Sequence, residues 1–386
     1  MRPLALYVHW PFCESKCPYC DFNSHVRKHV DQTIWRDALL AELEDSARLT
    51  GPRRLVSIFF GGGTPSLMAP ETVAALIERA RALWPADDPV EITLEANPSS
   101  VEAGRFRALA DAGVNRLSLG IQALDDAALG FLGRRHDSAA ARAAIATAQR
   151  HFGRVSLDFI YALPGQSLAD WRRALAEALA FGTEHLSLYQ LTIEPGTAFY
   201  ERHARGGFAL PDEDLAADLF ALTQDMTAAA GLPAYEISNH ARPAAACRHN
   251  LVYWRGGDYA GIGPGGHGRL RLATGWHATE TLAKPEAWAQ AVARHGHGRH
   301  VLAPLAGTER AREILMMGLR LAQGLDLDAV SRASGVELDA VIDAAARHML
   351  LADGLLAEQG GRLMVTPAGR PLTNSVLAAL LAEGAE

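Results

Sequence analysis

The 386-residue sequence contains no uninterrupted apolar stretch near the roughly 18 residues that a helix needs to span a membrane. It also contains no Gly-x-y period, and 49% of its residues are hydrophobic, which excludes a collagen-like or a disordered chain. Its 37 lysines and arginines form no long basic run and are outnumbered by 44 acidic residues, so the basic footprint of a nucleic-acid binder is missing. These absences indicate a globular protein without a nucleic-acid partner, of two or three domains at roughly 150 residues each.

The amino terminus lacks the pattern of a signal peptide. Its apolar run at residues 4–10 is short and contains His9. The run leads into Pro11 and a group of cysteines, where a signal peptide would have a small-residue cleavage site. We therefore expect a cytoplasmic protein.

Cysteine is scarce, and three of the four cysteines lie within eight positions. The spacing C-x3-C-x2-C is formed by Cys13, Cys17 and Cys20. A secreted disulfide framework would be denser and would follow a signal peptide. Structural zinc would need a fourth ligand, for which the candidates are Cys247, His9 and His25. Three soft thiolates on one short loop suit an iron–sulfur cluster better, because a [4Fe–4S] cube held by three cysteines keeps one iron open.

Strand and helix patterns alternate along the first part of the chain. Runs typical of strands occupy residues 4–9, 55–60, 90–95, 116–121, 155–162 and 185–192. Helical spacing of apolar residues occurs at 32–49, 70–84, 101–112, 137–151, 168–181 and 212–230. Six strand–helix units with nearly continuous apolar strands predict a parallel sheet, which either closes partway into a barrel or lies flat as a doubly wound sheet.

Polar or glycine residues lie near the end of each predicted strand or just after it, except that Asp158 lies within the fifth strand. The cysteine loop follows the first strand, and Gly61-Gly-Gly-Thr-Pro65 follows the second. The remaining four strands carry, in chain order, Glu95, Gln122, Asp158 and Thr192. Because the carboxyl ends of parallel strands meet at one edge, where barrel enzymes place their chemistry, we predict a single site there.

The rest of the chain follows different patterns. Residues 233–302 are rich in glycine and aromatic residues and show little helical period. Short helices are predicted at 309–321, 327–334, 338–352 and 375–382, with a β-hairpin from 354–356 and 362–366. Helices followed by a small hairpin suggest a winged-helix-like domain, although its few cations argue against DNA binding. We predict three parts, at residues 1–232, 233–305 and 306–386.

The stretch Tyr7-Val-His-Trp-Pro-Phe-Cys-Glu-Ser-Lys-Cys-Pro-Tyr-Cys20 resembles the cluster loop of the radical S-adenosylmethionine (SAM) family. The resemblance implies a partial (β/α)6 TIM-like barrel of the radical SAM type, with a smaller α+β carboxyl-terminal domain. It also implies a [4Fe–4S] cluster on Cys13, Cys17 and Cys20, whose open iron is chelated by the amino and carboxylate groups of SAM. In this family an electron from the reduced cluster, which needs an electron-donor partner, cleaves SAM to a 5′-deoxyadenosyl radical.

The same family implies that the glycine motif after the second strand receives the amino-acid end of SAM. In this sequence the motif includes Gly62, Gly63 and Thr64. A tight turn is the other interpretation, because glycine triplets are common between strands and helices. Tyr7 and Thr192 are two further residues expected to contact the cofactor.

Four polar or charged residues are expected to contact SAM on the same resemblance: Glu95, Gln122, Arg134 and Asp158. Charge complementarity pairs Arg134 with the SAM carboxylate and Glu95 with its ammonium group. Gln122 and Asp158 would then hold the ribose hydroxyls. A structural salt bridge is the alternative for the two acids, because a carboxylate on an apolar strand needs compensation.

A second motif, Arg248-His249-Asn250-Leu251-Val252-Tyr253-Trp254, resembles the haem-binding motif of a haem-chaperone branch of the family. A neutral histidine beside aromatic rings suits haem ligation and porphyrin stacking, which would be the roles of His249, Tyr253 and Trp254. A packed loop histidine is the alternative. Cys247, directly before the motif, is either a small buried side chain or an auxiliary ligand.

The resemblance covers nearly the whole chain and implies a protein that binds haem and delivers it to an acceptor protein, with peripheral membrane contact through that acceptor. The alternative is an enzyme like oxygen-independent coproporphyrinogen III oxidase, whose radical drives decarboxylation of propionate side chains. That oxidase carries a fourth cysteine, C-x3-C-x2-C-x-C, where this chain has Phe22, and a longer amino-terminal segment. Both differences favour the haem-chaperone branch.

Overall fold

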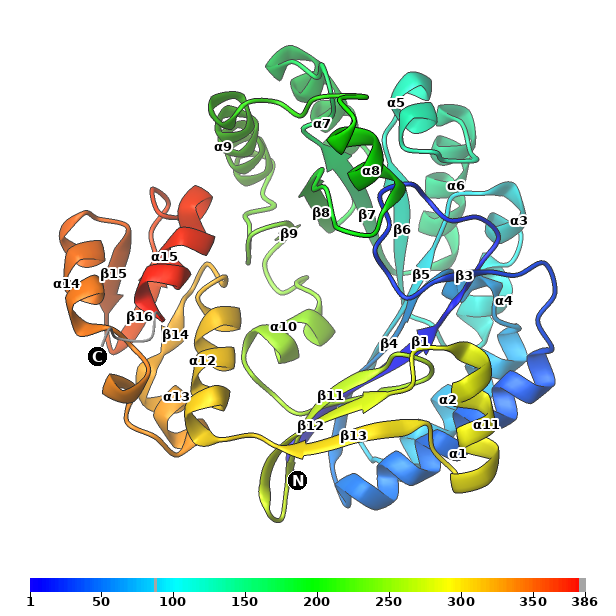
Figure 1. The fold of residues 1–386 in the computed structure, drawn as a ribbon. Helices are drawn as coiled ribbons and strands as arrows, with labels where there is room; N and C mark the ends of the chain where they lie inside the picture. The colour runs from blue at the N-terminus through cyan, green and yellow to red at the C-terminus, as the bar shows by residue number, and fades with distance from the viewer. Residues whose placement is uncertain (87–88, 382–386) are drawn as a thin grey trace.

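The computed structural model describes residues 1–86 and 89–381. Within them lies an 11-stranded sheet in the order β13-β12-β11-β10-β1-β4-β5-β6-β7-β8-β9. Its central strands run parallel to one another: β1 (Pro3–Trp10), β4 (Arg54–Gly62), β5 (Glu91–Ala96), β6 (Arg116–Gln122), β7 (Arg154–Tyr161) and β8 (His185–Gln190). The sheet curves into an arc with helices on its outer side (Figure 1), which confirms the predicted partial (β/α)6 barrel.

The long outer helices of the barrel begin within one residue of their predicted starts, and aspartate or serine side chains cap the first turns of four of them. Asp31 accepts the N–H groups of Thr33 and Ile34 at the start of α1 (Gln32–Thr50). Similar caps precede α6 (Ser138–His151), α7 (Leu168–Ala180) and α9 (Glu213–Ala229). The remaining helices of this part are α2 (Pro70–Leu83), α3 (Ser100–Ala103), α4 (Phe106–Asp111), α5 (Asp126–Phe131) and α8 (Ala198–Ala204). The segment 101–112 is therefore divided into two helices, and no helix in the described part of the chain is long and apolar enough to cross a bilayer.

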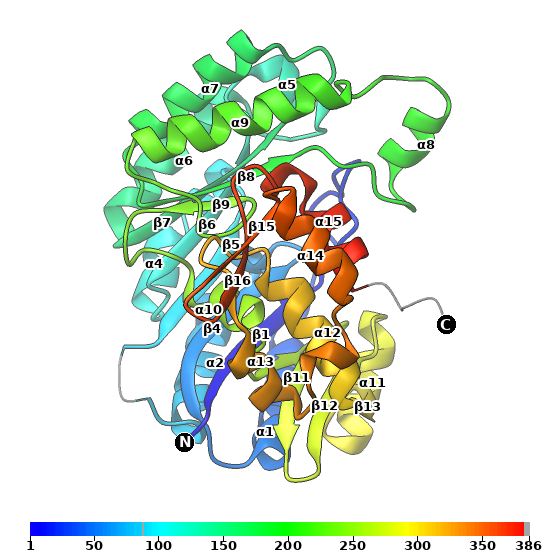
Figure 2. The same cartoon turned by 90° about the vertical axis from the view of Figure 1, so that its left-hand side faces the viewer.

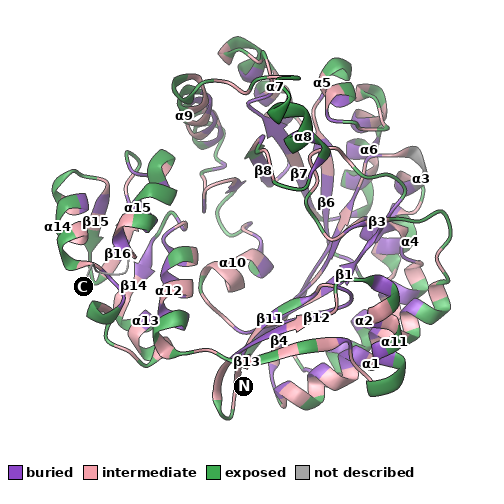
Figure 3. Ribbon diagram, viewed as in Figure 1, coloured by how far each residue is buried: buried purple, intermediate pink, exposed green. Residues whose placement is uncertain are grey.

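The parallel strands are buried along most of their length, as Figure 3 shows. This explains why their sequences are nearly continuous apolar runs and not alternating ones. Tryptophan side chains join the outer helices to this core. Trp35 of α1 packs edge-on against Trp10 of β1 and stacks on Trp288, with ring centroids 6.2 and 5.3 Å apart respectively. These contacts fix α1 against the sheet.

The region 233–302, which is rich in glycine and aromatic residues and for which no strand was predicted, extends the sheet at both edges. β9 (Asn239–Ala241) pairs with β8, and β10 (Tyr259–Ile262) pairs in parallel with β1. The other elements of the region are α10 (Arg248–Trp254), β11 (His267–Leu272), β12 (Gly275–Thr281), α11 (Pro285–His295) and β13 (Arg299–Pro304). A Cβ at Gly261 would lie 2.2 Å from the His267 carbonyl, and one at Gly263 would lie 2.3 Å from the His9 carbonyl. The glycines therefore permit close packing of strands.

The last part of the chain is a smaller α+β unit with its own hydrophobic core. Its elements are α12 (Gly307–Gly318), β14 (Leu325–Asp326), α13 (Leu327–Ser334), α14 (Ala344–Ala352), β15 (Leu356–Gln359), β16 (Arg362–Val365) and α15 (Thr373–Leu380). The prediction of one helix over 338–352 is wrong, because a 3-10 turn at Leu338–Ala340 precedes α14 and Asp343 caps the new helix. Residue 382, the predicted end of the last helix, lies outside the described residues.

This carboxyl-terminal unit lies across the open side of the curved sheet (Figures 1 and 2). It is joined to the region 233–302 by hydrogen bonds. The Ala322 N–H donates to the Tyr235 carbonyl at 2.9 Å, and the Trp276 indole donates to the Ala333 carbonyl at 2.8 Å. The Arg310 guanidinium lies 4.1 Å from the centroid of the Trp276 ring. The unit therefore forms one wall of the space inside the arc.

Candidate cofactor site

A cavity of about 1130 Å³ lies at the carboxyl ends of the parallel strands, between the sheet and the carboxyl-terminal unit. Most of the predicted site residues line it: Cys13, Cys17, Cys20, Gly62, Gly63, Thr64, Glu95, Gln122, Arg134, Asp158 and Thr192. Most of them come from the ends of the six parallel strands or from the loops that follow them, whereas Asp158 lies inside β7 and Arg134 lies between α5 and α6. The structure therefore brings together at one edge the residues that the strand pattern places there.

The cysteine loop leaves the sheet after β1 and is held by its own backbone. Cys13 ends the short strand β2 (Phe12–Cys13), which pairs in parallel with β3 (His25–Val26). The Cys20 N–H donates to the Cys17 carbonyl at 3.1 Å, which closes a turn between the second and third cysteines. Pro18 of this turn packs so closely on Gly133 that a Cβ there would lie 2.6 Å from the Pro18 ring. These contacts keep three cysteine side chains at the cavity.

Two of the thiols already accept hydrogen bonds from side chains. Thr64 Oγ1 donates to Cys13 Sγ, and Arg134 Nη1 donates to Cys17 Sγ, both at 3.3 Å. Burial raises the pKa of Cys13 and of Cys20, and the neighbouring thiols raise both further. A bound cation would offset this cost, because a cysteine binds metal as the thiolate. The donor set of three sulfurs on one loop therefore fits an iron–sulfur cluster.

The residues considered as a fourth zinc ligand have other partners. His9 Nε2 contacts the Asn23 carbonyl at 2.9 Å, and His25 Nε2 contacts Asn23 Oδ1 at 3.1 Å. Cys247 lies at the opposite end of the barrel, against Glu91. Among the described residues, no three His, Cys, Asp or Glu side chains converge to hold a single metal ion. This arrangement gives no support to a tetrahedral zinc site.

The glycine motif packs directly on the cysteine loop. The Gly63 N–H donates to the Trp10 carbonyl at 2.7 Å, and a Cβ at Gly63 would lie 2.8 Å from the Phe12 carbonyl and 3.0 Å from Cys13 Sγ. Gly62 has a φ of +111°, which L side chains rarely adopt, and a Cβ there would collide with His9. Both glycines are therefore needed for the two loops to approach each other, whatever else binds there.

Glu95 and Asp158 face the cavity from neighbouring parts of the barrel wall. Glu95 accepts the Gly62 N–H at 3.2 Å, and Asp158 accepts the Ser118 hydroxyl at 3.0 Å. Burial, with a smaller contribution from the Asp158 charge, raises the pKa of Glu95 to about 8, and burial also raises the pKa of Asp158. Neither acid forms an ion pair with any described residue. The alternative of a structural salt bridge is therefore wrong for the described part of the chain.

Arg134 reaches the cavity beside the second cysteine. Its Nη2 donates to Asn97 Oδ1 at 2.6 Å and to the Gly120 carbonyl at 2.9 Å, which orients the guanidinium. Gln122, at the end of β6, has a φ of +67°. A positive φ in a non-glycine residue stores strain, and such residues cluster at functional sites.

Tyr7 is not among the cavity-lining residues. It points into the barrel interior, where its hydroxyl contacts His9 Nδ1 at 3.1 Å and its ring stacks on Phe59 at a centroid distance of 6.2 Å. Burial raises the pKa of Tyr7, and the Glu95 charge raises it further. Tyr7 therefore lies behind the cofactor cavity, and its predicted contact with SAM stays a prediction.

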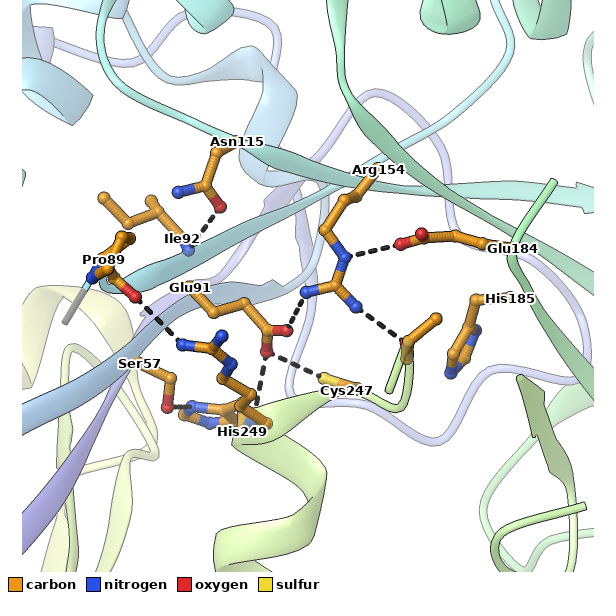
Figure 4. A network of polar contacts seen from close by, with 12 residues as sticks. Ser57, Pro89, Glu91, Ile92, Asn115, Arg154, Glu184, His185, Cys247 and His249 are labelled. Carbon is orange, nitrogen blue, oxygen red and sulfur yellow. Dashed lines mark hydrogen bonds and ion pairs between the residues drawn. The ribbon is translucent and has the colours of Figure 1, made fainter. Parts of the chain in front are cut away.

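The predicted haem motif lies apart from the cavity, on α10 at the amino ends of the strands (Figure 4). His249 is 1% exposed, and both of its ring nitrogens have partners. Nδ1 contacts Ser57 Oγ at 2.9 Å, and Nε2 contacts the Tyr253 hydroxyl at 2.7 Å. Burial lowers the pKa of His249 to about 3, so its imidazole is neutral. Trp254, on the last turn of the helix, has a buried indole N–H without a hydrogen-bond partner among the described residues.

A buried acid holds the start of α10 (Figure 4). Glu91 Oε1 accepts the His249 N–H at 3.1 Å and the Cys247 thiol at 3.4 Å, while Oε2 pairs with Arg154 at 2.5 Å. Arg154 also pairs with Glu184 at 2.5 Å. Burial raises the pKa of Cys247 to about 11, so it is a neutral thiol in this packing. Of the two interpretations of Cys247, the structure shows the buried one.

Several cavity residues were missed by the sequence analysis: Asn97, Ser118, Arg320 and Arg370. Asn97 carried a usable signal, since it is a polar residue directly after a predicted strand, two positions beyond Glu95. Arg320 ends the stretch Met317-Gly-Leu-Arg320, which resembles the family but gave it no role in the site, and Arg370 carried no signal. Both belong to the carboxyl-terminal unit and reach the cavity only through the folding of the whole chain.

Two family models match this chain. The Radical SAM superfamily model matches residues 7–178, and the HemN C-terminal domain model matches residues 305–372. The partial barrel, with its three-cysteine loop at the carboxyl edge, and these two matches define a radical SAM protein.

Its relatives identify the family within that class. The chain is 37% identical over 391 positions to the heme chaperone HemW of Escherichia coli K12, with 99% of each protein covered. It is 36% identical over 390 positions to HemW of Mycobacterium tuberculosis, covering 98% of this chain and 95% of that one. It is also 44% identical over 328 positions to the mitochondrial radical S-adenosyl methionine domain-containing protein 1 of Bos taurus, covering 83% of this chain and 74% of that one. The chain belongs to the HemW family.

A solved structure with the same fold is coproporphyrinogen III oxidase (HemN) from Escherichia coli. The TM-score is 0.81, with 22% sequence identity over 99% of this chain and 90% of the other. At this level of identity the likeness shows the fold alone.

Proposed function

We propose that this protein is a haem carrier that holds a [4Fe–4S] cluster on Cys13, Cys17 and Cys20, binds SAM in the cofactor cavity, and passes haem to an acceptor protein. The observation that carries the cofactor part is the single cavity in which three thiols, two unpaired carboxylates and an arginine meet. The haem part rests on the relatives named as heme chaperones and on the His249 motif.

The cavity residues match the chemical groups of the two cofactors. Three thiolates would hold three of the four irons, which leaves the fourth for SAM. Glu95 would pair with the SAM ammonium group, whose positive charge would favour the carboxylate form of this buried acid, and Arg134 would pair with the SAM carboxylate. Gln122 and Asp158 would hold the ribose hydroxyls. When bound, a reduced cluster supplies an electron to the SAM sulfonium.

The haem motif is preformed but covered. A neutral imidazole is the form that ligates haem iron, and burial keeps His249 in that form. Its Nε2 is occupied by the Tyr253 hydroxyl, so iron binding through this nitrogen requires Tyr253 to move. Trp254 would then stack on the porphyrin. Removal of the Tyr253 hydroxyl in Tyr253→Phe is expected to keep an aromatic ring and to strengthen haem binding.

Anaerobic titration of haem into cluster-reconstituted protein tests the proposal. The wild type is expected to saturate at one haem per chain, and His249→Ala to lose this binding because the iron ligand is gone. His300→Ala, which removes an exposed histidine of β13, is the matched control and should titrate like the wild type. Weak, unsaturable binding that is the same in wild type and His249→Ala would contradict the proposal.

A further inference from the structure

Two arginines of the carboxyl-terminal unit line the cofactor cavity opposite the cysteine loop. Arg320 follows α12, and Arg370 begins the 3-10 turn Arg370–Leu372 that leads into α15. Arg320 Nη2 donates to Asn374 Oδ1 at 2.9 Å, whereas Arg370 Nη2 is buried without a hydrogen-bond partner among the described residues. Neither guanidinium forms an ion pair within the part of the chain that the structure describes.

The surroundings of these arginines supply little negative charge. Burial lowers the pKa of both Arg320 and Arg370, and the charge of Glu236 opposes that shift in each case. Glu236 itself is buried, and its carboxylate accepts hydrogen bonds from Asn239 Nδ2 at 2.5 Å and from the Ser238 N–H at 3.3 Å. The carboxylate is therefore engaged by its own loop. A guanidinium removed from water without a carboxylate partner costs free energy, which a bound anion would offset.

On the barrel side the cavity is lined by Glu95, Asp158 and Arg134, and on the side of the carboxyl-terminal unit it is lined by Arg320 and Arg370. The cavity lining also includes apolar side chains, among them Phe220, Ile237 and Leu372, of which Leu372 ends the 3-10 turn that Arg370 begins. An apolar surface beside two planar cations suits a ligand with an apolar body and carboxylate groups at one edge.

We propose that Arg320 and Arg370 form a carboxylate-binding site for the propionate side chains of a tetrapyrrole that lies in the cofactor cavity. This inference rests on the proposed function, because it takes the cargo to be a tetrapyrrole. It adds a second contact region, distinct from the His249 motif on α10. The guanidinium forks bind the propionates, and the apolar surface packs against the ring.

Metal-free protoporphyrin IX tests this site without any contribution from iron ligation by His249. In fluorescence titrations of cluster-reconstituted protein, Arg320→Gln and Arg370→Gln are each expected to raise the dissociation constant about tenfold, as for the loss of a charge-assisted hydrogen bond. Protoporphyrin IX dimethyl ester, whose two propionates carry no charge, should lose both contacts and bind the wild type about 100-fold more weakly than the acid. Each single variant should bind the ester about as weakly as the wild type does, because the arginine that it lacks has no carboxylate partner in the ester. Arg332→Gln, at an exposed position of α13, should match the wild type.

Equal binding of the acid and the ester to the wild type would overturn this inference, as would arginine variants that bind the acid within about twofold of the wild type. Arg320→Lys and Arg370→Lys keep the charge without the planar fork, and they replace the glutamine variants if those do not fold. The haem titration with His249→Ala reports separately on the proposed function. If the wild type binds haem stoichiometrically but binds the acid and the ester equally well, the proposed haem-carrier function stands and the proposed arginine site is ruled out.

Discussion

The two ends of the same barrel treat buried charge in opposite ways. At the carboxyl end, Glu95 and Asp158 face a cavity with no ion-pair partner among the described residues, and Arg370 leaves one nitrogen unbonded. At the amino end, Glu91 is bound by three partners, and both ring nitrogens of His249 are occupied. Buried polar groups are stable only when they are compensated. The end whose acids accept hydrogen bonds but have no ion-pair partner among the described residues is therefore where ligands are expected, and the end with the ion-paired acid is where the chain stabilises itself.

Substitution of one cysteine at each end of the barrel is expected to show the largest difference between the two ends. Cys17→Ser removes a ligand from the carboxyl-end loop and is expected to abolish the cluster, because only two thiolates would remain. Cys247→Ser changes a neutral thiol of the amino-end network and should leave the cluster intact. Iron content and visible absorbance after anaerobic reconstitution measure both. Loss of the cluster in Cys247→Ser, or its retention in Cys17→Ser, would contradict the assignment.

Glu91→Gln tests whether the amino end is a stabilising network. The substitution leaves Arg154 without its buried counter-charge and loosens the start of α10, so the free energy of unfolding should fall by about 3 kcal/mol. Glu184→Gln removes the other partner of the same arginine, but Glu184 is 31% exposed against 1% for Glu91. Its expected cost is below about 1 kcal/mol. Equal costs in urea unfolding would show that burial does not distinguish the two pairs.

Glu95→Gln tests the opposite expectation at the carboxyl end. The amide cannot neutralise the SAM ammonium group, so the dissociation constant for SAM should rise about 30-fold, or about 2 kcal/mol. The free energy of unfolding should not fall, because the burial that raises the pKa of Glu95 also disfavours its charge in the folded protein. Calorimetric titration and urea unfolding give the two values, with Glu71→Gln on the exposed face of α2 as control. Normal SAM affinity with lost stability would make Glu95 structural.

The smallest expected effect concerns His185, whose protonation makes the free energy of unfolding depend on pH. Burial lowers its pKa well below the usual value, with smaller contributions from Arg116, His240 and Arg154. Between about pH 6.5 and the folded pKa, the unfolded chain therefore binds one more proton, so stability falls as the pH falls. At pH 5.5 this residue alone should cost about 1.4 kcal/mol relative to pH 8.

His185→Gln keeps partners for Ser156 and Tyr235, which contact the two ring nitrogens at 2.7 and 3.0 Å. The variant should therefore lose this share of the pH dependence even if its stability at pH 8 also changes. Urea unfolding at both pH values gives the difference for each protein. A slope identical to that of the wild type would mean that His185 is protonated in the folded state.

Local patterns made the barrel and the cysteine end predictable. The barrel strands are nearly continuous apolar runs, and their functional residues lie near or after their ends, apart from Asp158 inside β7, so most of the site could be assigned to one edge without knowledge of the packing. The strands of the 233–302 region were missed because Gly261 and Gly263 weaken the strand pattern, while their need for close backbone contact arises only in the folded sheet.

The amino-end network was not predictable, because its partners are far apart in the sequence. His249 was recognised through a motif, but its hydrogen bonds to Ser57 and Glu91 cross 192 and 158 residues. The same holds for Arg320 and Arg370, to which no local pattern gave a role in the site and which become cavity residues only when the carboxyl-terminal unit closes the arc. Long-range compensation of charge is therefore the part of the structure that composition and periodicity do not encode.

The most direct test of the account is the electron paramagnetic resonance spectrum of the reduced, reconstituted cluster, with and without SAM. If three cysteines hold the cluster and one iron stays open, SAM should bind that iron and shift the g-values in the wild type. The shift should be unchanged in Cys247→Ser. Unchanged g-values on addition of SAM, or loss of the cluster in Cys247→Ser, would contradict the central claim. That claim is that the carboxyl end of the barrel holds a cluster with one open iron and that the amino end takes no part in it.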